Sequence, residues 1–173
     1  MFATIYLPNF YLQAALRHQP ELARTPVALI DGEAAKAVIM QMNQAAESAG
    51  VHGGMTPSQG LERCLQLVVK TRTRAQENAI EQIVLQHACS LSPFIEATAP
   101  GVCTVEFTSR NEIAPRVSRM VEHLAQSGIH AQAGIAQTPD SSMLVAHLAR
   151  PVLQIGDAKT FLASLPIETL EIV

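Results

Sequence analysis

The sequence contains few charged residues and no excess of positive charge. Of its 173 residues, 16% are charged and 48% are hydrophobic, and the formal net charge is −3. Because proteins bind nucleic acids mainly by neutralising phosphates, we expect this chain alone to contact DNA weakly. The low charge content suggests that missing sequence or a partner covers part of the surface, although a well-packed α/β domain rich in Ala and Leu would have the same composition.

Long hydrophobic runs and paired cysteines are also absent. No run of about 18 apolar residues occurs, and the chain does not begin with the basic region and cleavage site of a signal peptide, so we expect a cytoplasmic protein without membrane contact. Cys64, Cys89 and Cys103 form no CxxC pair, and their odd number favours reduced, buried and inert thiols. A catalytic Cys–His pair stays open, because such partners meet only in the fold.

Two further kinds of site motif are missing. The six histidines have no metal-ligand spacing, which predicts surface or polar-core side chains. Gly50, Gly53 and Gly54 do not form the GxxxxGK pattern of a phosphate loop, and turn geometry accounts for them.

The chain does contain one dense basic stretch, with Lys70, Arg72 and Arg74. This stretch leads into a predicted long helix, at whose start positive charge is mildly unfavourable. We expect either a solvated connector or a contact with DNA phosphates or an acidic protein surface.

Apolar periodicity predicts short strands alternating with helices. A Thr56–Gln59 capping box and the stop signals Gly50 and Gly128 mark helix ends. The order of elements predicts an α+β domain with helices packed on a central mixed sheet. The predicted strands are 2–7, 26–30, 37–42, 67–69, the two strands of a hairpin within 94–108, and 129–136; the predicted helices are 9–18, 43–49, 56–64, 73–91, 115–127, 141–149 and 157–165.

Four segments resemble those of the Y-family translesion DNA polymerases (UmuC/DinB-like proteins), in order and at near-constant spacing. The most specific is 38–55, in which a strand and Asn43 lead to a helix and then to Gly-Val and Gly-Met, as in the fingers signature. The resemblance extends from residue 3 to about residue 170. Residues 20–29 resemble the early palm, 95–108 the catalytic hairpin, and 134–136 with 165–167 the closing palm strand and the thumb entrance.

The resemblance implies an α+β fold made of two parts. A polymerase-like palm, with a mixed or antiparallel sheet and two long helices, would comprise residues 1–42 and 71–165. A small helical fingers subdomain would be inserted at 43–70, and 166–173 would begin a missing thumb region. We therefore expect the chain to be a piece of a longer protein.

The resemblance also implies where catalytic groups should lie. In the family, an Asp at the end of the first strand and an Asp-Glu pair in the hairpin hold two magnesium ions for phosphoryl transfer. Here the first position falls on Leu7, or on Tyr6 if the alignment slips by one, and the pair falls on Gly101 and Val102. Because none of these side chains binds magnesium, we expect no catalytic residue, no metal site, no magnesium cofactor and no enzymatic activity.

The residues that grip the incoming triphosphate in the family are a Tyr and an Arg, which correspond to Gln44 and Glu47. Replacing Arg by Glu exchanges charge-assisted hydrogen bonds, worth about 1.5–3 kcal/mol each, for repulsion. The later palm Lys of the family is unmatched near Ser142, Met143 and His147. We therefore expect nucleotide binding to be lost as well.

A displaced metal site formed by Asp31, Glu96 and Glu106 is an alternative. It is disfavoured because Glu106 lies several residues from the hairpin turn and is expected to be an exposed edge carboxylate.

Within the family, the pattern is similar to the ImuB branch, whose opening Leu-Pro matches Leu7–Pro8. This similarity implies a non-catalytic scaffold in DNA damage tolerance, including translesion synthesis and SOS mutagenesis, that acts by protein contacts and weak DNA contact. The implied partners are a RecA-like accessory protein, an error-prone C-family polymerase and, through sequence beyond residue 173, the sliding clamp. The alternatives are an active template-directed DNA polymerase with relocated metal ligands and an unrelated α+β small-molecule-binding protein.

Overall fold

The computed structural model describes residues 1–32, 37–109, 111–163, 165, 166 and 169, and its internal contacts divide the chain into two compact units. Unit 1 comprises Met1–Pro8 and Glu81–Val173, and unit 2 comprises Asn9–Ile80. Each unit has its own sheet.

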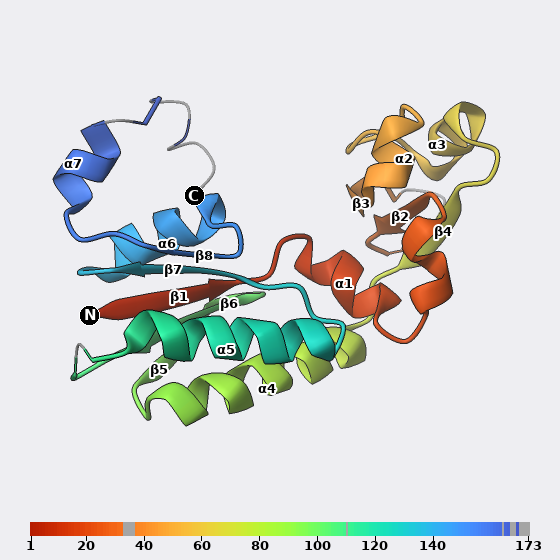
Figure 1. Ribbon diagram of the computed structural model, residues 1–173. Coiled ribbons are helices and arrows are strands. Elements are labelled where there is room, and N and C mark those ends of the chain that lie inside the picture. The colour runs from red at the N-terminus through yellow and green to blue at the C-terminus, as the bar shows by residue number, and fades with distance from the viewer. Residues whose placement is uncertain (33–36, 110, 164, 167–168, 170–173) are drawn as a thin grey trace. The chain divides into compact units, whose positions relative to one another are not determined.

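The sheet of unit 1 has five strands in the order β5-β6-β1-β7-β8 (Figure 1). All neighbouring strands are antiparallel except β7 and β8, which are parallel, so the sheet is mixed. The strands are β1 (Phe2–Tyr6), β5 (Ile95–Ala99), β6 (Val102–Glu106), β7 (Gln132–Ala136) and β8 (Val152–Gln154).

Helices cover both faces of this sheet. The long helices α4 (Arg74–Leu91) and α5 (Ile113–Gln126) lie on one face, and α6 (Pro139–Leu148) packs on the other, over β1 and β7 (Figure 1). Helix α7 (Ala158–Ala163) follows β8. Helix α5 places its apolar residues at helical spacing, which buries one stripe against the sheet. The buried side chains of this stripe are Ile113, Val117, Met120, Val121 and Leu124.

Gly134 lets α6 approach β7 closely. A Cβ atom at this position would overlap the backbone of Ser142 and of Ala146 on α6. Only a residue without a side chain permits this approach. The packing of α6 on the sheet therefore depends on this glycine.

The sheet of unit 2 has three strands in the order β3-β2-β4. The central strand β2 (Val27–Ile30) pairs antiparallel with β3 (Ile39–Met42) and parallel with β4 (Val68–Thr71). Around it lie the helices α1 (Phe10–Leu16), α2 (Gln44–Ser48) and α3 (Pro57–Arg63), and a 3₁₀ helix, η1, at Pro20–Arg24.

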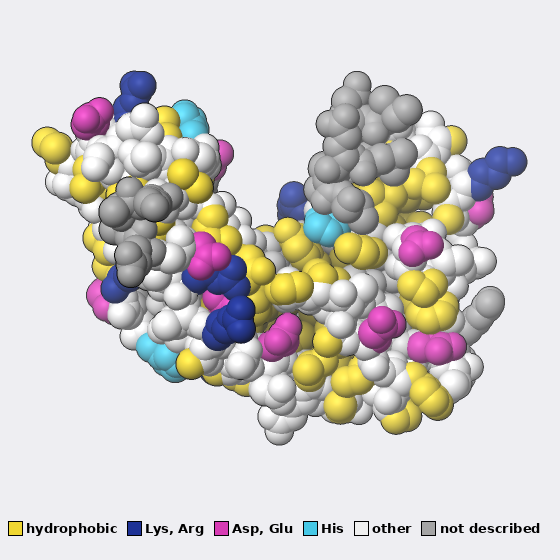
Figure 2. Space-filling view, turned by 180° about the vertical axis from the view of Figure 1, so that it is seen from behind, with side chains coloured by type: hydrophobic (Ala, Val, Ile, Leu, Met, Phe, Trp, Pro, Cys, Tyr) yellow, Lys and Arg dark blue, Asp and Glu magenta, His cyan; other side chains and the backbone are white. Residues whose placement is uncertain are grey.

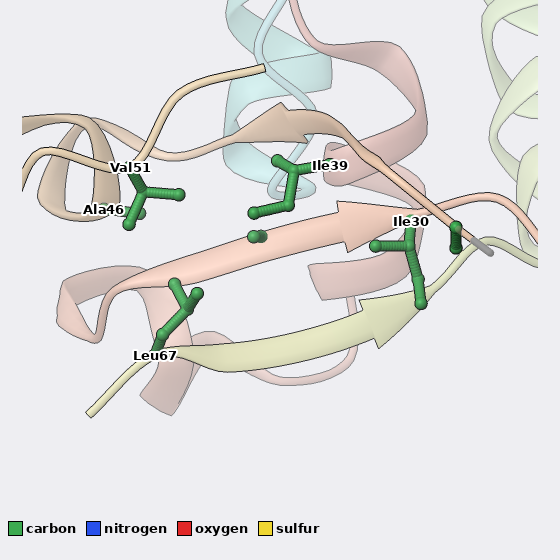
Figure 3. Packing of buried hydrophobic residues seen from close by; sticks show 7 residues of the cluster. Ile30, Ile39, Ala46, Val51 and Leu67 are labelled. Atoms are coloured by element: carbon green, nitrogen blue, oxygen red, sulfur yellow. The ribbon is translucent and has the colours of Figure 1, made fainter. Parts of the chain in front are cut away.

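Strand β2 is buried on both faces, so successive side chains enter two different clusters. On one face, Ile30, Ile39, Ala46, Val51 and Leu67 converge between the strands and α2 (Figure 3). On the other face, Val27 and Leu29 pack with residues of α1.

Asn43 connects three backbone segments of unit 2. Its Oδ1 accepts hydrogen bonds from the amide of Ala46, which caps α2, and from the amide of Val27, each at 3.0 Å. Its Nδ2 donates to the carbonyl of Thr25 at 2.7 Å. One side chain thus fixes the start of α2 against β2.

The α+β fold, the hairpin and the two long helices are confirmed, whereas the single central sheet is wrong. The predicted strands 26–30, 37–42 and 67–69 form a separate sheet. The expected domains (1–42 with 71–165, and 43–70) stay a prediction, and the two compact units divide the chain differently, with residues 9–42 and 71–80 in unit 2. Strand β8 and helix η1 were not predicted.

Some predicted features lie outside the described residues. These are residue 33, between the predicted strands 26–30 and 37–42, residue 164 in the last predicted helix, and 167, 168 and 170–173 in the predicted thumb region. In the part of the chain that is described, no helix is long and apolar enough to cross a membrane.

Candidate functional site

The end of β1 lies beside the turn between β5 and β6. The amide of Leu7 donates to the carbonyl of Gly101 at 2.9 Å, and Tyr6 lies directly opposite Val102 in the antiparallel ladder. Gly101 has φ +73°, a left-handed conformation that the turn requires. The structure therefore brings together the positions that the sequence resemblance predicts for the three catalytic acids of the family.

Strand alternation separates the two candidates for the first acid position. Directly opposed residues of an antiparallel pair point to the same face, so the side chains of Tyr6 and Val102 share one face of the sheet. Leu7 is only 1% exposed and, like Ile5, is part of the core. Of the two, Tyr6 is the residue whose side chain lies beside Val102.

An aromatic pair occupies the space beside Tyr6. Its ring stacks on that of His147 from α6, with centroids 4.0 Å apart and planes inclined at 33°. Burial raises the pKa of Tyr6 and lowers the pKa of His147. Both shifts favour the neutral form at pH 7, so this pair adds no charge to the site.

Neutral hydroxyl groups continue along the same sheet face. Thr4 Oγ1 lies 2.7 Å from Ser142 Oγ and 3.3 Å from Thr104 Oγ1, which lies 2.9 Å from Thr98 Oγ1. Ser142 Oγ donates to the carbonyl of Pro139 at 2.7 Å. Because each hydroxyl has one hydrogen, Thr4 must then donate to Ser142, and Thr104 to Thr4.

The side chains at this end of the sheet do not fit magnesium. Magnesium requires hard oxygen ligands in near-octahedral geometry, which a hydrogen atom, an isopropyl group and a neutral phenol at Gly101, Val102 and Tyr6 do not provide. Glu106 lies four residues beyond Val102 on β6, about 13 Å away at the rise of a strand.

The three carboxylates of the alternative, displaced metal site lie in two different units. Asp31 belongs to unit 2 and its carboxylate pairs with Arg72 at 3.2 Å, whereas Glu96 and Glu106 are exposed on the sheet of unit 1. Among the residues described, no group of three or more His, Cys, Asp or Glu side chains could hold a metal ion.

Gln44 and Glu47, which the sequence resemblance predicts at the triphosphate-binding positions, lie on α2. Gln44 and Glu47 are both exposed, and a separation of three residues places them on one face of the helix. Ala46, between them, is buried in the core of unit 2. This exposed face presents an amide and a carboxylate, which do not attract phosphate groups.

Acidic side chains of unit 2 neutralise one residue of the basic stretch, Arg72. Arg72 Nε and Nη2 donate to Glu77 at 2.8 and 2.7 Å, and Nη1 donates to Asp31 at 3.2 Å. The guanidinium also lies 4.1 Å from the centroid of the Tyr11 ring. Its hydrogen bond to Glu77, followed by the charges of Glu77 and Asp31, raises the pKa of Arg72.

Arg72 is therefore a structural group of unit 2, whereas Arg74 is exposed and Lys70 is half-buried. As contact residues for DNA or a partner, Lys70, Arg72 and Arg74 remain a prediction. Sequence reasoning missed Glu77 and Tyr11 as partners of Arg72, because the basic run itself carries no signal for them.

The three cysteines differ in their surroundings. Cys103 is buried, and burial raises its pKa to about 11, which makes it unreactive at neutral pH. Cys64 is half-buried and Cys89 is exposed, so the prediction of buried thiols is wrong for Cys89.

Known proteins resemble this chain over nearly its whole length. DNA polymerase IV of Ralstonia nicotianae is 21% identical over 170 residues, and DNA polymerase IV of Pseudomonas syringae pv. tomato is 28% identical over 172 residues. Each alignment covers 93% of this chain and 48% of the relative. The chain thus spans about half the length of these relatives.

Solved structures of Y-family polymerases share the fold. A post-insertion binary complex of Dbh DNA polymerase has a TM-score of 0.85 at 15% identity and matches 97% of this chain and 52% of its own. DinB from Sulfolobus solfataricus has a TM-score of 0.81 at 15% identity, with the same shares covered. A family model described as impB/mucB/samB matches residues 5–149. The chain therefore contains a Y-family DNA polymerase-like domain and belongs to the impB/mucB/samB family.

Proposed function

We propose that this chain is part of a non-catalytic, polymerase-like scaffold in DNA damage tolerance. The observation that carries the proposal is the side-chain chemistry at the meeting point of β1 and the hairpin. There Tyr6 and Leu7 lie beside Gly101 and Val102, and the sequence resemblance implies that the three carboxylates of the family correspond to positions among these residues. The matching family and fold support the general role.

Two-metal phosphoryl transfer requires carboxylates to hold the ions over the attacking hydroxyl and the triphosphate. The geometry favours Tyr6 over Leu7 as the first altered position, because Tyr6 shares a face with Val102. The Tyr6–His147 pair places neutral aromatic carbon beside Val102. Relocated ligands would need to meet at this turn, and Glu106 lies about 13 Å from it along β6.

The charge distribution supports a role based on protein contacts. Unit 1 has nine Asp and Glu residues and five Lys and Arg residues, which gives a formal net charge of −4. Unit 2 has six Asp and Glu residues and seven Lys and Arg residues, which gives +1. On the face shown in Figure 2, hydrophobic side chains lie among other uncharged side chains, and the charged groups form small separate clusters. With a net charge of −4, unit 1 repels DNA phosphates, so this unit makes at most weak contact with DNA.

The scaffold would act in the cytoplasm. We propose as its partners the proteins implied by the ImuB-like pattern, which are a RecA-like accessory protein, an error-prone C-family polymerase and the sliding clamp. No magnesium cofactor is required for such a role.

The proposal is tested by primer extension and by nucleotide titration. The purified chain, and the longest natural form of the protein that contains it, are incubated with primed DNA, deoxynucleoside triphosphates and either magnesium or manganese. DNA polymerase IV of Pseudomonas syringae, a relative, is the positive control. We expect no extension by the protein and no calorimetric heat for magnesium with a nucleotide. Extension by the longer protein would establish an active polymerase with relocated ligands.

A further inference from the structure

The half of the sheet of unit 1 that α6 leaves uncovered contains a groove of about 300 Å³. Phe2, Phe94, Glu96, Glu106 and Pro139 are among the residues that line it. It lies toward the end of β1 away from Tyr6, since Phe2 pairs with Glu106 whereas Tyr6 pairs with Val102. Its residues have no part in the altered catalytic positions.

An unpaired strand edge borders the groove. Strand β5 is the outermost strand, and no further strand pairs with it in the described structure. The carbonyl of Phe94 accepts from the amide of Glu106 at 2.9 Å, so Phe94 and Glu96 direct their backbone groups toward β6. Alternation then directs the backbone N–H and C=O groups of Ile95 and Ala97 outward, where another strand could pair with them.

The side chains along this edge combine negative charge with an exposed aromatic ring. Glu96 lies opposite Thr104, two residues before Glu106 on β6, so both carboxylates project from the same face. Both are exposed, and within the described residues neither takes part in an ion pair. Phe94 is 56% exposed, an unusual state for a large hydrophobic side chain.

We propose that this groove binds an extended, basic segment of a partner protein, which adds to β5 as a further strand. The outward backbone groups of Ile95 and Ala97 would pair with the segment, as in other strand-addition complexes. A Lys or Arg side chain on the groove face would reach Glu96, and another would extend toward Glu106, one strand spacing of about 4.8 Å farther. An apolar residue of the segment would cover Phe94.

The negative charge around the groove favours a basic protein segment over a nucleic acid as the occupant. Two unpaired carboxylates in a unit of net charge −4 repel phosphates and attract cationic side chains. The proposal rests on the scaffold function in one respect, because that function supplies the need for a protein partner. It does not rest on the state of the catalytic positions.

The test uses a short synthetic peptide that alternates lysine with valine. It is titrated at low salt into the isotopically labelled chain, and backbone amide shifts are followed by NMR. We expect the amides of Ile95 and Ala97 to shift. A matching peptide with glutamate in place of lysine, and a lysine peptide N-methylated to block backbone pairing, should each bind at least about tenfold more weakly.

Matched variants locate the contact. The double variant Glu96→Lys with Glu106→Lys should weaken peptide binding about tenfold, since it turns two attractions into repulsions. The double variant Glu112→Lys with Glu122→Lys makes the same change in net charge at exposed positions on α5 and its N-cap, and should bind within about twofold of the unaltered chain.

Several outcomes would overturn the proposal. They are the absence of peptide binding, binding that the groove variants do not weaken, equal binding of the N-methylated peptide, and a double-stranded oligonucleotide that shifts the same amides. Failure of this proposal is distinct from failure of the scaffold function: primer extension by the protein refutes the scaffold and leaves peptide binding as measured, whereas loss of peptide binding refutes the groove alone.

Discussion

The ring of Tyr6 on β1 stacks on the ring of His147 on α6, with centroids 4.0 Å apart. The contact joins the end of the central strand to the helix that covers it. Burial keeps both groups neutral at pH 7, because it lowers the pKa of His147 and raises the pKa of Tyr6. The pair thus places two neutral rings beside Val102, at a position where the sequence resemblance implies an acid in the family.

Acidification is expected to destabilise the fold through His147. Because burial lowers the pKa of His147 in the folded chain, the unfolded chain takes up the proton first as the pH falls. The stabilisation is complete above the unfolded pKa of about 6.5 and is lost as the pH falls from there through the folded pKa. Urea unfolding at about pH 7.5 and about pH 5.5 should show a smaller pH-dependent loss of stability for His147→Gln than for the unaltered chain. Equal losses would assign the effect to other groups.

Gly134→Ala should strongly destabilise unit 1. The added Cβ would overlap the backbone of Ser142 and Ala146, so α6 must move off the sheet, at a cost of about 3 kcal/mol or more in the free energy of unfolding. Gly156→Ala is the matched control, because its Cβ would meet nothing within 4 Å, and should change stability by less than about 0.5 kcal/mol. Chemical denaturation followed by circular dichroism measures both. Similar values for the two variants would contradict the close packing of α6.

Arg72→Ala should destabilise unit 2 more than removal of any exposed charge. It would leave Glu77, which is 7% exposed, without its bidentate partner, at a cost of about 3 kcal/mol in the free energy of unfolding. Arg72→Lys should recover only part of the loss, because an ammonium group cannot form both bonds. The control Arg74→Ala, at an exposed position two residues away, should be nearly neutral. Urea denaturation distinguishes them, and comparable effects of Arg72→Ala and Arg74→Ala would contradict the pairing.

Restoring carboxylates alone should not restore polymerisation. In the triple variant Tyr6→Asp, Gly101→Asp and Val102→Glu, the exposed residues Gln44 and Glu47 remain where the sequence resemblance predicts a Tyr and an Arg for triphosphate binding.

We also expect this triple variant to be destabilised by about 1–3 kcal/mol, because Val102 is 8% exposed and a carboxylate there loses solvation. Primer extension is measured once circular dichroism shows that the variant is folded. The control is a second triple variant, in which Leu7→Asp takes the place of Tyr6→Asp. Extension by a triple variant would show that the residues of α2 are not limiting.

Sequence reasoning located features that depend on local chemistry. The Pro100–Gly101 turn and its flanking strands were predictable because a turn selects residues by their own backbone preferences, as the φ of Gly101 shows. The capping box at Thr56 and Gln59 likewise acts within one helical turn, and the structure contains it.

Features that depend on distant partners were not predictable. Strands β2, β3 and β4 carry apolar runs that fit either a central sheet or a separate one, and only long-range pairing decides between them. The contact of Tyr6 with His147 and the contact of Arg72 with Tyr11 each join segments far apart in the chain. Periodicity carries no information about such contacts.

The hydrogen bond between the amide of Leu7 and the carbonyl of Gly101 uses main-chain atoms only. The side chains around it can therefore change without loss of this main-chain link. Clustered carboxylates also repel one another, so their removal relieves an electrostatic strain that an active enzyme must tolerate. Main-chain architecture and side-chain chemistry are thus separable at this junction.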